Sequence, residues 1–159
     1  MAAPAFEIRP SPIQGFGAWA VRPIRKGARI VEYVGERIGS AEAEERYDDD
    51  ASEHPHVLLF TVDEETVIDA GVGGNEARFF NHSCAPNCET VVEKGRVFIV
   101  ARRAIAPGEE LTYDYQLERP GRAKAEWARR YACRCGAKRC RGTMLAPRAK
   151  RRPKKQGAG

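Results

Sequence analysis

Residues 78–88 read Arg-Phe-Phe-Asn-His-Ser-Cys-Ala-Pro-Asn-Cys, and the interpretation of the whole chain starts from them. Two aromatic residues lead into Asn81 and His82, Cys84 follows, and the Pro86-Asn87 pair forces a turn. Polar side chains that can contact a ligand are therefore presented on a stiff bend. Taken alone, the segment is explained equally well as a surface turn that carries a buried pair of phenylalanines.

Two segments further along the chain decide between these interpretations. Residues 109–115 read Glu-Glu-Leu-Thr-Tyr-Asp-Tyr, and residues 133–140 read Cys-Arg-Cys-Gly-Ala-Lys-Arg-Cys. Together the three segments resemble the SET-domain protein lysine methyltransferases, and the likeness runs from Phe6 to Leu145. No cysteine-rich region precedes residue 84, and the motifs are closer to the trithorax and mixed-lineage-leukaemia branch of that family.

Length and charge predict a single domain followed by a basic tail. The 159 residues are enough for one hydrophobic core. Without the six positive charges of residues 148–155, the net charge of +5 becomes −1. A tail of Pro, Lys, Arg and Gly cannot bury enough apolar surface to fold, so we expect it to be disordered. Its charge suits contact with nucleic acid, since phosphate binding needs only charge and reach.

Cysteine usage and the absence of an apolar span predict an intracellular protein. Residues 1–12 lack an apolar run with a cleavage-like site, and no segment is long enough to cross a bilayer, so no membrane association is expected. Five cysteines in that setting, three of them within eight residues, favour metal binding over disulfides. The expected location is the cytoplasm of a bacterium or the nucleus and chromosomes of a eukaryote.

The pattern of short apolar runs and frequent Gly and Pro turns predicts a mostly β fold. Strands are expected at residues 6–9, 18–21, 29–34, 57–63, 66–69, 90–92, 96–101 and 111–115. Short helices are expected at residues 41–47, 75–80 and 122–131. The resemblance implies a SET-domain fold of small curved β-sheets, with residues 113–115 threaded under residues 81–84 as a C-terminal pseudoknot. It divides the chain into a SET domain (1–117), a post-SET zinc-binding segment (118–146) and the basic tail (147–159).

The resemblance also implies which residues form the site. It implies that S-adenosylmethionine is contacted by Phe16, Gly17, Arg78, Asn81, His82 and Tyr115. It assigns the lysine channel and catalysis to Tyr33, Tyr113 and Tyr115, with Tyr115 closest to the transferred methyl group. Taken singly, Tyr33 and Tyr115 are also explained as core aromatics, and the two glycines around Phe16 as a plain hairpin turn.

Three of the cysteines are spaced for a metal ion. Cys133 and Cys135 lie on the same side of an extended segment, Gly136 allows a turn, and Cys140 returns a third thiol. The resemblance supplies Cys84 as the fourth zinc ligand. Free buried thiols or a redox pair are the alternatives, and Cys88 is left over as a small buried hydrophobic residue.

The function that follows is protein lysine N-methyltransferase, acting on basic proteins such as histones. The resemblance implies that Tyr113 restricts the product to mono- and dimethyl-lysine, because in the family a tyrosine hydroxyl at this position and its bound water narrow the pocket. Leu58 departs from a tyrosine that the family often carries, which leaves a catalytically weak binding module on chromatin as the alternative. The acidic residues 42–50 are either a solvated face or an attraction for a basic peptide.

Overall fold

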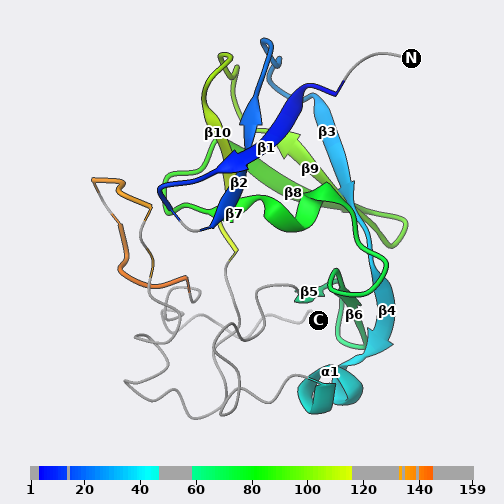
Figure 1. Cartoon of the computed structure of the whole chain (residues 1–159). Coiled ribbons are helices and arrows are strands. Elements are labelled where there is room, and N and C mark those ends of the chain that lie inside the picture. The colour runs from blue at the N-terminus through cyan, green and yellow to red at the C-terminus, as the bar shows by residue number, and fades with distance from the viewer. Residues whose placement is uncertain are drawn as a thin grey trace, which may run out of the picture.

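The computed structural model describes residues 4–13, 15–46, 59–115, 133, 135–138 and 140–144, with no side-chain detail for 44–46. Figure 1 shows that the described chain forms small β-sheets packed together, and that α1 lies at the opposite end of the molecule from the N-terminus. The predicted helix at 122–131, Leu58 and the basic tail lie outside the described residues.

The first sheet brings the two decisive motifs together. Its strand order is β1-β2-β10-β7, formed by β1 (Phe6–Pro10), β2 (Phe16–Ala20), β10 (Glu110–Tyr113) and β7 (Asn81–His82). β10 pairs antiparallel with β2 and parallel with β7, where Thr112 lies opposite Asn81 and Tyr113 opposite His82. The amide of Ser83 donates to the carbonyl of Tyr113 and continues the pairing. The predicted side-by-side placement of residues 113–115 and 81–84 is thus confirmed.

The second sheet has the order β3-β9-β8 and contains the strands predicted at residues 90–92 and 96–101. β8 (Cys88–Glu93) and β9 (Arg96–Ala101) pair antiparallel across a two-residue loop. Lys94 and Gly95 both have positive φ, 52° and 78°, as a hairpin turn of this type requires. β9 is buried from Val97 to Ala101 because β3 (Arg29–Tyr33) pairs along its other edge.

The third sheet and the helix form the other end of the molecule. Its order is β4-β6-β5, with β4 (Glu36–Gly39), β6 (Thr66–Asp69) and β5 (Leu59–Thr61). α1 (Ser40–Arg46) follows β4 directly, and Ser40 is its first residue, with its hydroxyl donating to the carbonyl of Glu64. The strand predicted at residues 29–34 ends at Tyr33, and β4 begins three residues later at Glu36.

The main core cluster draws residues from all three sheets and includes residues of the predicted site. Phe80, Ile99 and Leu111 are completely buried, and Tyr33 and Tyr113 belong to the same cluster. The segment 75–80, predicted as a short helix, is the 3₁₀ helix η1 (Glu76–Phe79), capped by the Asn75 side chain. No helix among the described residues is long and apolar enough to cross a membrane. A mostly β fold of small sheets with little helix was correctly predicted.

Candidate functional site

Three tyrosines gather where β10 leaves the first sheet. The rings of Tyr113 and Tyr115 lie 5.0 Å apart between centroids, and Tyr115 also meets His82 edge to face at 5.4 Å. Tyr33, at the end of β3, is 2% exposed and packs against Phe60 at 5.3 Å. Tyr33 and Tyr113 are core residues, and Tyr115 packs against them from the partly exposed side. Residues more than 80 positions apart in sequence therefore form one aromatic cluster.

The hydroxyl of Tyr115 has a fixed direction. It donates a hydrogen bond to the carbonyl oxygen of Phe80, at the end of η1, so its own oxygen is left as an acceptor. Burial, and then the neighbouring Tyr33 and Glu110, raise the pKa of Tyr115 above its usual value. Burial, Tyr33 and Tyr115 likewise raise the pKa of Tyr113. Both phenols stay protonated and neutral near pH 7.

His82 is engaged at both ring nitrogens. Its Nδ1 accepts the backbone amide of Tyr115 at 3.0 Å, and its Nε2 lies 3.4 Å from the sulfur of Cys84. Burial, and then Arg141, lower the pKa of His82 to about 4 against the opposing effect of Asp114. The imidazole is therefore a neutral bridge from the tyrosine segment to the cysteine cluster. The sequence interpretation did not assign His82 as a general base, and this geometry gives no reason to do so.

The residues predicted to contact the methyl donor meet around Asn81. Its side-chain nitrogen donates to the carbonyl of Phe16 at 3.0 Å and to Oε2 of Glu110 at 2.9 Å. Phe16 itself is 55% exposed at the start of β2. Arg78, in η1, holds its guanidinium over the ring of Phe79 at 4.9 Å. Phe16, Gly17 and Asn81 are thus in contact. Among the described residues, Arg78 makes no hydrogen bond or ion pair with these three.

Gly17 has a close neighbour within the chain. A Cβ atom built on it would lie 2.1 Å from Oε2 of Glu110 and 3.0 Å from Nδ2 of Asn81. The sequence pattern attributed the paired glycines to a close approach by a ligand or to a turn. The side of Gly17 where a Cβ would project is filled instead by the carboxylate of Glu110.

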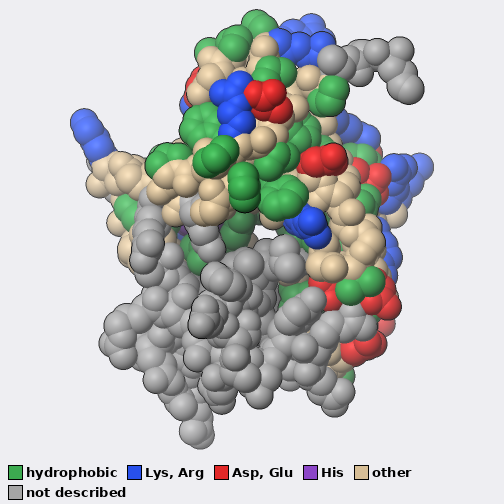
Figure 2. Space-filling view, in the orientation of Figure 1, with side chains coloured by type: hydrophobic (Ala, Val, Ile, Leu, Met, Phe, Trp, Pro, Cys, Tyr) green, Lys and Arg blue, Asp and Glu red, His purple; other side chains and the backbone are tan. Residues whose placement is uncertain are grey.

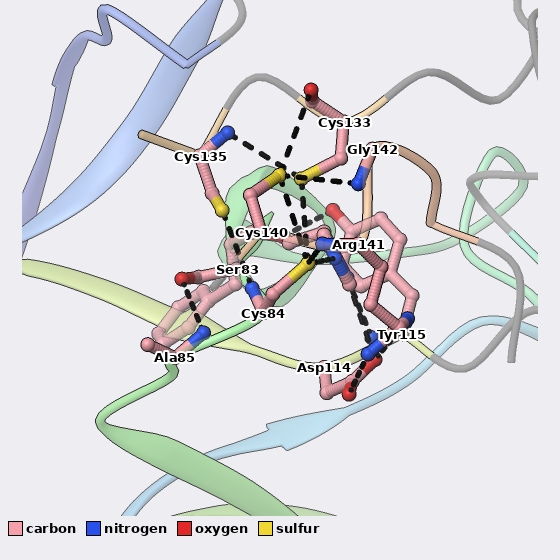
Figure 3. Close-up of polar contacts among 12 residues, drawn as sticks. Ser83, Cys84, Ala85, Asp114, Tyr115, Cys133, Cys135, Cys140, Arg141 and Gly142 are labelled. Atoms are coloured by element: carbon pink, nitrogen blue, oxygen red, sulfur yellow. Dashed lines mark hydrogen bonds and ion pairs between the residues drawn. The ribbon is translucent and has the colours of Figure 1, made fainter. Parts of the chain in front are cut away.

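Four cysteine sulfurs form the second part of the site. The sulfurs of Cys84, Cys133, Cys135 and Cys140 all lie within 4.8 Å of one another. Figure 3 shows these four side chains gathered at one place. The sulfur of Cys84 is 3.8 Å from that of Cys133 and 4.0 Å from that of Cys140. A tetrahedral ion with sulfur ligands at about 2.3 Å separates those sulfurs by about 3.8 Å. The cluster therefore fits a four-coordinate metal ion.

Backbone amides donate to sulfurs of the cluster, while burial raises the pKa of the Cys84 and Cys133 thiols. The amide of Arg141 donates to the sulfur of Cys84 at 3.3 Å, and the amide of Gly142 donates to Cys140 at 3.3 Å. Burial acts to raise the pKa of Cys135, but hydrogen bonds from the amides of Cys84 and Ala137 outweigh it and lower that pKa to about 6. Hydrogen bonds to the ionised form are what a metal-binding thiolate needs. Cys88 is buried away from the cluster, with its thiol directed at Asn87.

An ion pair joins the cysteine segment to the tyrosines. Arg141 makes two hydrogen bonds to Asp114, at 2.8 and 3.0 Å, and Asp114 stands between Tyr113 and Tyr115 in the chain (Figure 3). Asp114 also lies 3.6 Å from Nδ1 of His82. The pair fixes the C-terminal described residues beside the end of β10.

Several of these contacts were not predicted from the sequence. Asp114, Arg141 and Glu110 stood inside or beside quoted motifs, but only the folded chain supplies their partners. Asn87 is a fourth example: its buried side chain accepts from the amide of Thr112 and donates to the carbonyl of Glu110. Each of these residues lies in or beside a motif, but its partner is 23 to 29 residues away in sequence, so the motif alone does not reveal the pairing.

Acidic side chains gather at the end of the molecule that carries α1. Figure 2 shows them at the lower right, over the region of β4 and α1. Exposed members include Glu36, Glu42, Glu64 and Glu65. The acidic residues at 48–50 lie outside the described residues.

Comparison with known proteins identifies the family. Residues 15–116 match the SET domain family, which is most of the chain, so this protein belongs to that family. The predicted resemblance is confirmed.

The relatives it matches are much larger proteins. It is 41% identical over 138 residues to "Histone-lysine N-methyltransferase trr" of Drosophila melanogaster, which covers 84% of this chain and 6% of the relative. It is 43% identical over 141 residues to "Histone-lysine N-methyltransferase, H3 lysine-4 specific" of Eremothecium gossypii, covering 84% and 14%. It is 36% identical over 138 residues to "Histone-lysine N-methyltransferase 2D" of Homo sapiens, covering 84% and 2%. The chain thus spans a small fraction of the length of these relatives.

Proposed function

We propose that this protein is a protein lysine N-methyltransferase that uses S-adenosylmethionine and acts on basic proteins such as histones. Membership of the SET domain family and the names of the three relatives support the activity and the substrate class. A histone substrate would put the protein on chromatin in a eukaryotic cell.

The observation that carries this proposal is the hydroxyl of Tyr115. Its proton is directed to the carbonyl of Phe80, so its oxygen accepts from a substrate amine beside the rings of Tyr113 and His82. Tyr115 lies just beyond the last residue of β10, at the partly exposed edge of the core.

The chemistry requires a neutral amine more than it requires a base. A lysine side chain has a pKa of about 10.4, so making it neutral at pH 7 requires roughly 4 to 5 kcal/mol. Aromatic walls lower that pKa because they desolvate the ammonium. Tyr33, Tyr113 and Tyr115 are the walls in this proposal, and S-adenosylmethionine supplies a methyl group on a positively charged sulfur. No ionised side chain is needed, which agrees with the protonated phenols.

The residues around Asn81 are our candidates for holding the methyl donor. They are Phe16, Gly17, Arg78, Asn81, His82 and Tyr115. Backbone groups of β2 and β7 would supply polar contacts close to the tyrosines, because β7 pairs directly with β10. Positioning of donor and amine is then the main contribution of the protein, as expected for an in-line transfer.

Zinc is the metal that we assign to the cysteine cluster. Four thiolates in a tetrahedral arrangement are typical of structural zinc, and a closed set of four leaves no position for catalysis. Because His82 joins Cys84 to the backbone of Tyr115, the ion would stabilise the tyrosine segment from behind.

We further propose that products are mainly mono- and dimethyl-lysine. Tyr113 is 6% exposed and its ring lies against Tyr115, so its hydroxyl occupies space that a bulkier methylated amine would need. The division into residues 1–117, 118–146 and 147–159 is part of the same proposal, with the basic tail contacting nucleic acid and taking no part in the chemistry.

A labelled methyl donor tests the activity. The purified protein is incubated with the labelled donor and histones, with Tyr115→Phe as the control. Label on histones that falls at least tenfold in the control is the expected result, since an oriented catalytic group contributes about 10²-fold or more. Equal labelling by the two proteins, or none by either, would overturn the proposal.

A further inference from the structure

We infer that Glu110 is a positioning residue that fixes the orientation of the Asn81 side chain toward the methyl donor. The inference rests on the proposed function, since it takes Asn81 as part of the donor site. Glu110 was part of a quoted motif, but neither the sequence nor the family assignment gives it a role.

Among the described residues, the Glu110 side chain forms hydrogen bonds to Asn81 of β7 and to Ser11 in the β1–β2 loop. Its Oε2 accepts from Nδ2 of Asn81 at 2.9 Å, and both its oxygens lie within 2.9 Å of the hydroxyl of Ser11. The carboxylate lies over the Cα of Gly17, where no other residue type would leave room for it. The half-buried carboxylate of Glu110 thus lies between the β1–β2 loop and β7.

A carboxylate is a selective partner for an amide. It only accepts hydrogen bonds, so Asn81 can face it only through its nitrogen. The second N–H of the same nitrogen donates to the carbonyl of Phe16. Turning the amide over would lose both hydrogen bonds and set its oxygen against two other oxygens. The carbonyl oxygen of Asn81 is therefore held away from Glu110 and Phe16. In our inference this oxygen accepts from an N–H group of the donor.

Charge alone is the competing explanation. Among the described residues, the Glu110 side chain forms hydrogen bonds to Ser11 and Asn81 and no ion pair. A bare carboxylate near a cationic donor would attract that donor at any orientation of Asn81. The two explanations differ for Glu110→Gln. A glutamine can still offer an oxygen to Asn81 while its amide donates to Ser11, so it keeps the orientation but removes the charge.

Donor affinity, measured by isothermal titration calorimetry with S-adenosylmethionine, tests the inference without reference to activity. Glu110→Met removes the acceptor at similar volume and is expected to weaken binding about five- to tenfold, as for the loss of one hydrogen bond. Glu110→Gln should retain most of the affinity. In an Asn81→Ala background, Glu110→Met should change affinity less than twofold, because Glu110 acts through Asn81. Glu109→Met, which removes an equal charge one position away, is the matched control and should bind normally.

Each other outcome has a defined meaning. The positioning role would be overturned if Glu110→Gln and Glu110→Met weakened donor binding equally. It would also be overturned if Glu110→Met weakened binding as much in the Asn81→Ala background as in the unmodified protein. Neither result would affect the proposed function. Failure of the unmodified protein to bind the donor would overturn both. If Glu110→Met does not fold, side-chain amide NMR of the unmodified protein decides: slow exchange of the Asn81 amide protons supports the inference, and fast exchange overturns it.

Discussion

Replacing Arg141 with methionine should loosen the cysteine segment from the tyrosines. The guanidinium makes two hydrogen bonds to Asp114, and the two side chains are 23% and 20% exposed. Breaking a bidentate pair at this depth removes about 1–3 kcal/mol of stability, because the carboxylate left behind is partly desolvated. The cysteine contact of residue 141 uses its backbone amide, so the metal site itself should survive.

Thermal unfolding followed by circular dichroism measures this effect. A loss of about 2 kcal/mol corresponds to a fall of roughly 4–8 °C in Tm for a chain of this size. Arg103→Met is the control, since Arg103 also pairs with a carboxylate, Glu109, at 2.8 Å but is 55% exposed. Exposed pairs contribute about 0–1 kcal/mol. Equal Tm shifts in the two variants, or no shift in Arg141→Met, would refute the role given to burial of the Arg141 pair.

Three further predictions follow from the site. Metal analysis should find about one zinc per chain, lost in a Cys84→Ser, Cys140→Ser double variant and kept in Cys88→Ser; zinc retained by the double variant would contradict the ligand assignment. Tyr113→Phe should shift exhaustive turnover toward trimethyl-lysine with little change in the first transfer, whereas trimethyl-lysine from the unmodified protein would contradict the narrow pocket. Because burial raises the pKa of Tyr115, its phenol stays protonated as pH rises, so the rate should climb between pH 7 and 9.5 as lysine deprotonates; a falling limb in that range would mean that the phenol ionises.

The fold could be predicted where local chemistry dictates structure. The β8–β9 hairpin follows from alternation around a Lys94-Gly95 turn, and β6 was predicted at its observed bounds. The strand predicted at 111–115 ends at Tyr113 instead, because the next residues leave the sheet to meet His82 and Arg141. Two-residue β7 carries no periodic signal of its own, and only its pairing with β10 makes it a strand.

The residues of the candidate site could be identified from the sequence, but the contacts between their side chains could not. The four cysteines were identified in advance, three from spacing and Cys84 from the family resemblance, and their sulfurs do converge. The bridging position of His82 and the carboxylate over Gly17 could not be foreseen, because they depend on side-chain contacts between segments far apart in sequence. The sequence identifies the functional side chains. It does not identify the neighbouring groups whose hydrogen bonds fix the orientation of those side chains.

Tandem mass spectrometry of histone-tail peptides, after incubation with the protein and S-adenosylmethionine, tests the central proposal most directly because it locates the methyl group on a particular atom. The prediction is a methyl mark on the ε-nitrogen of lysine, formed by the unmodified protein and reduced at least tenfold with Tyr115→Phe. Methylation found on another side chain, or lysine methylation that is unchanged by Tyr115→Phe, would contradict it.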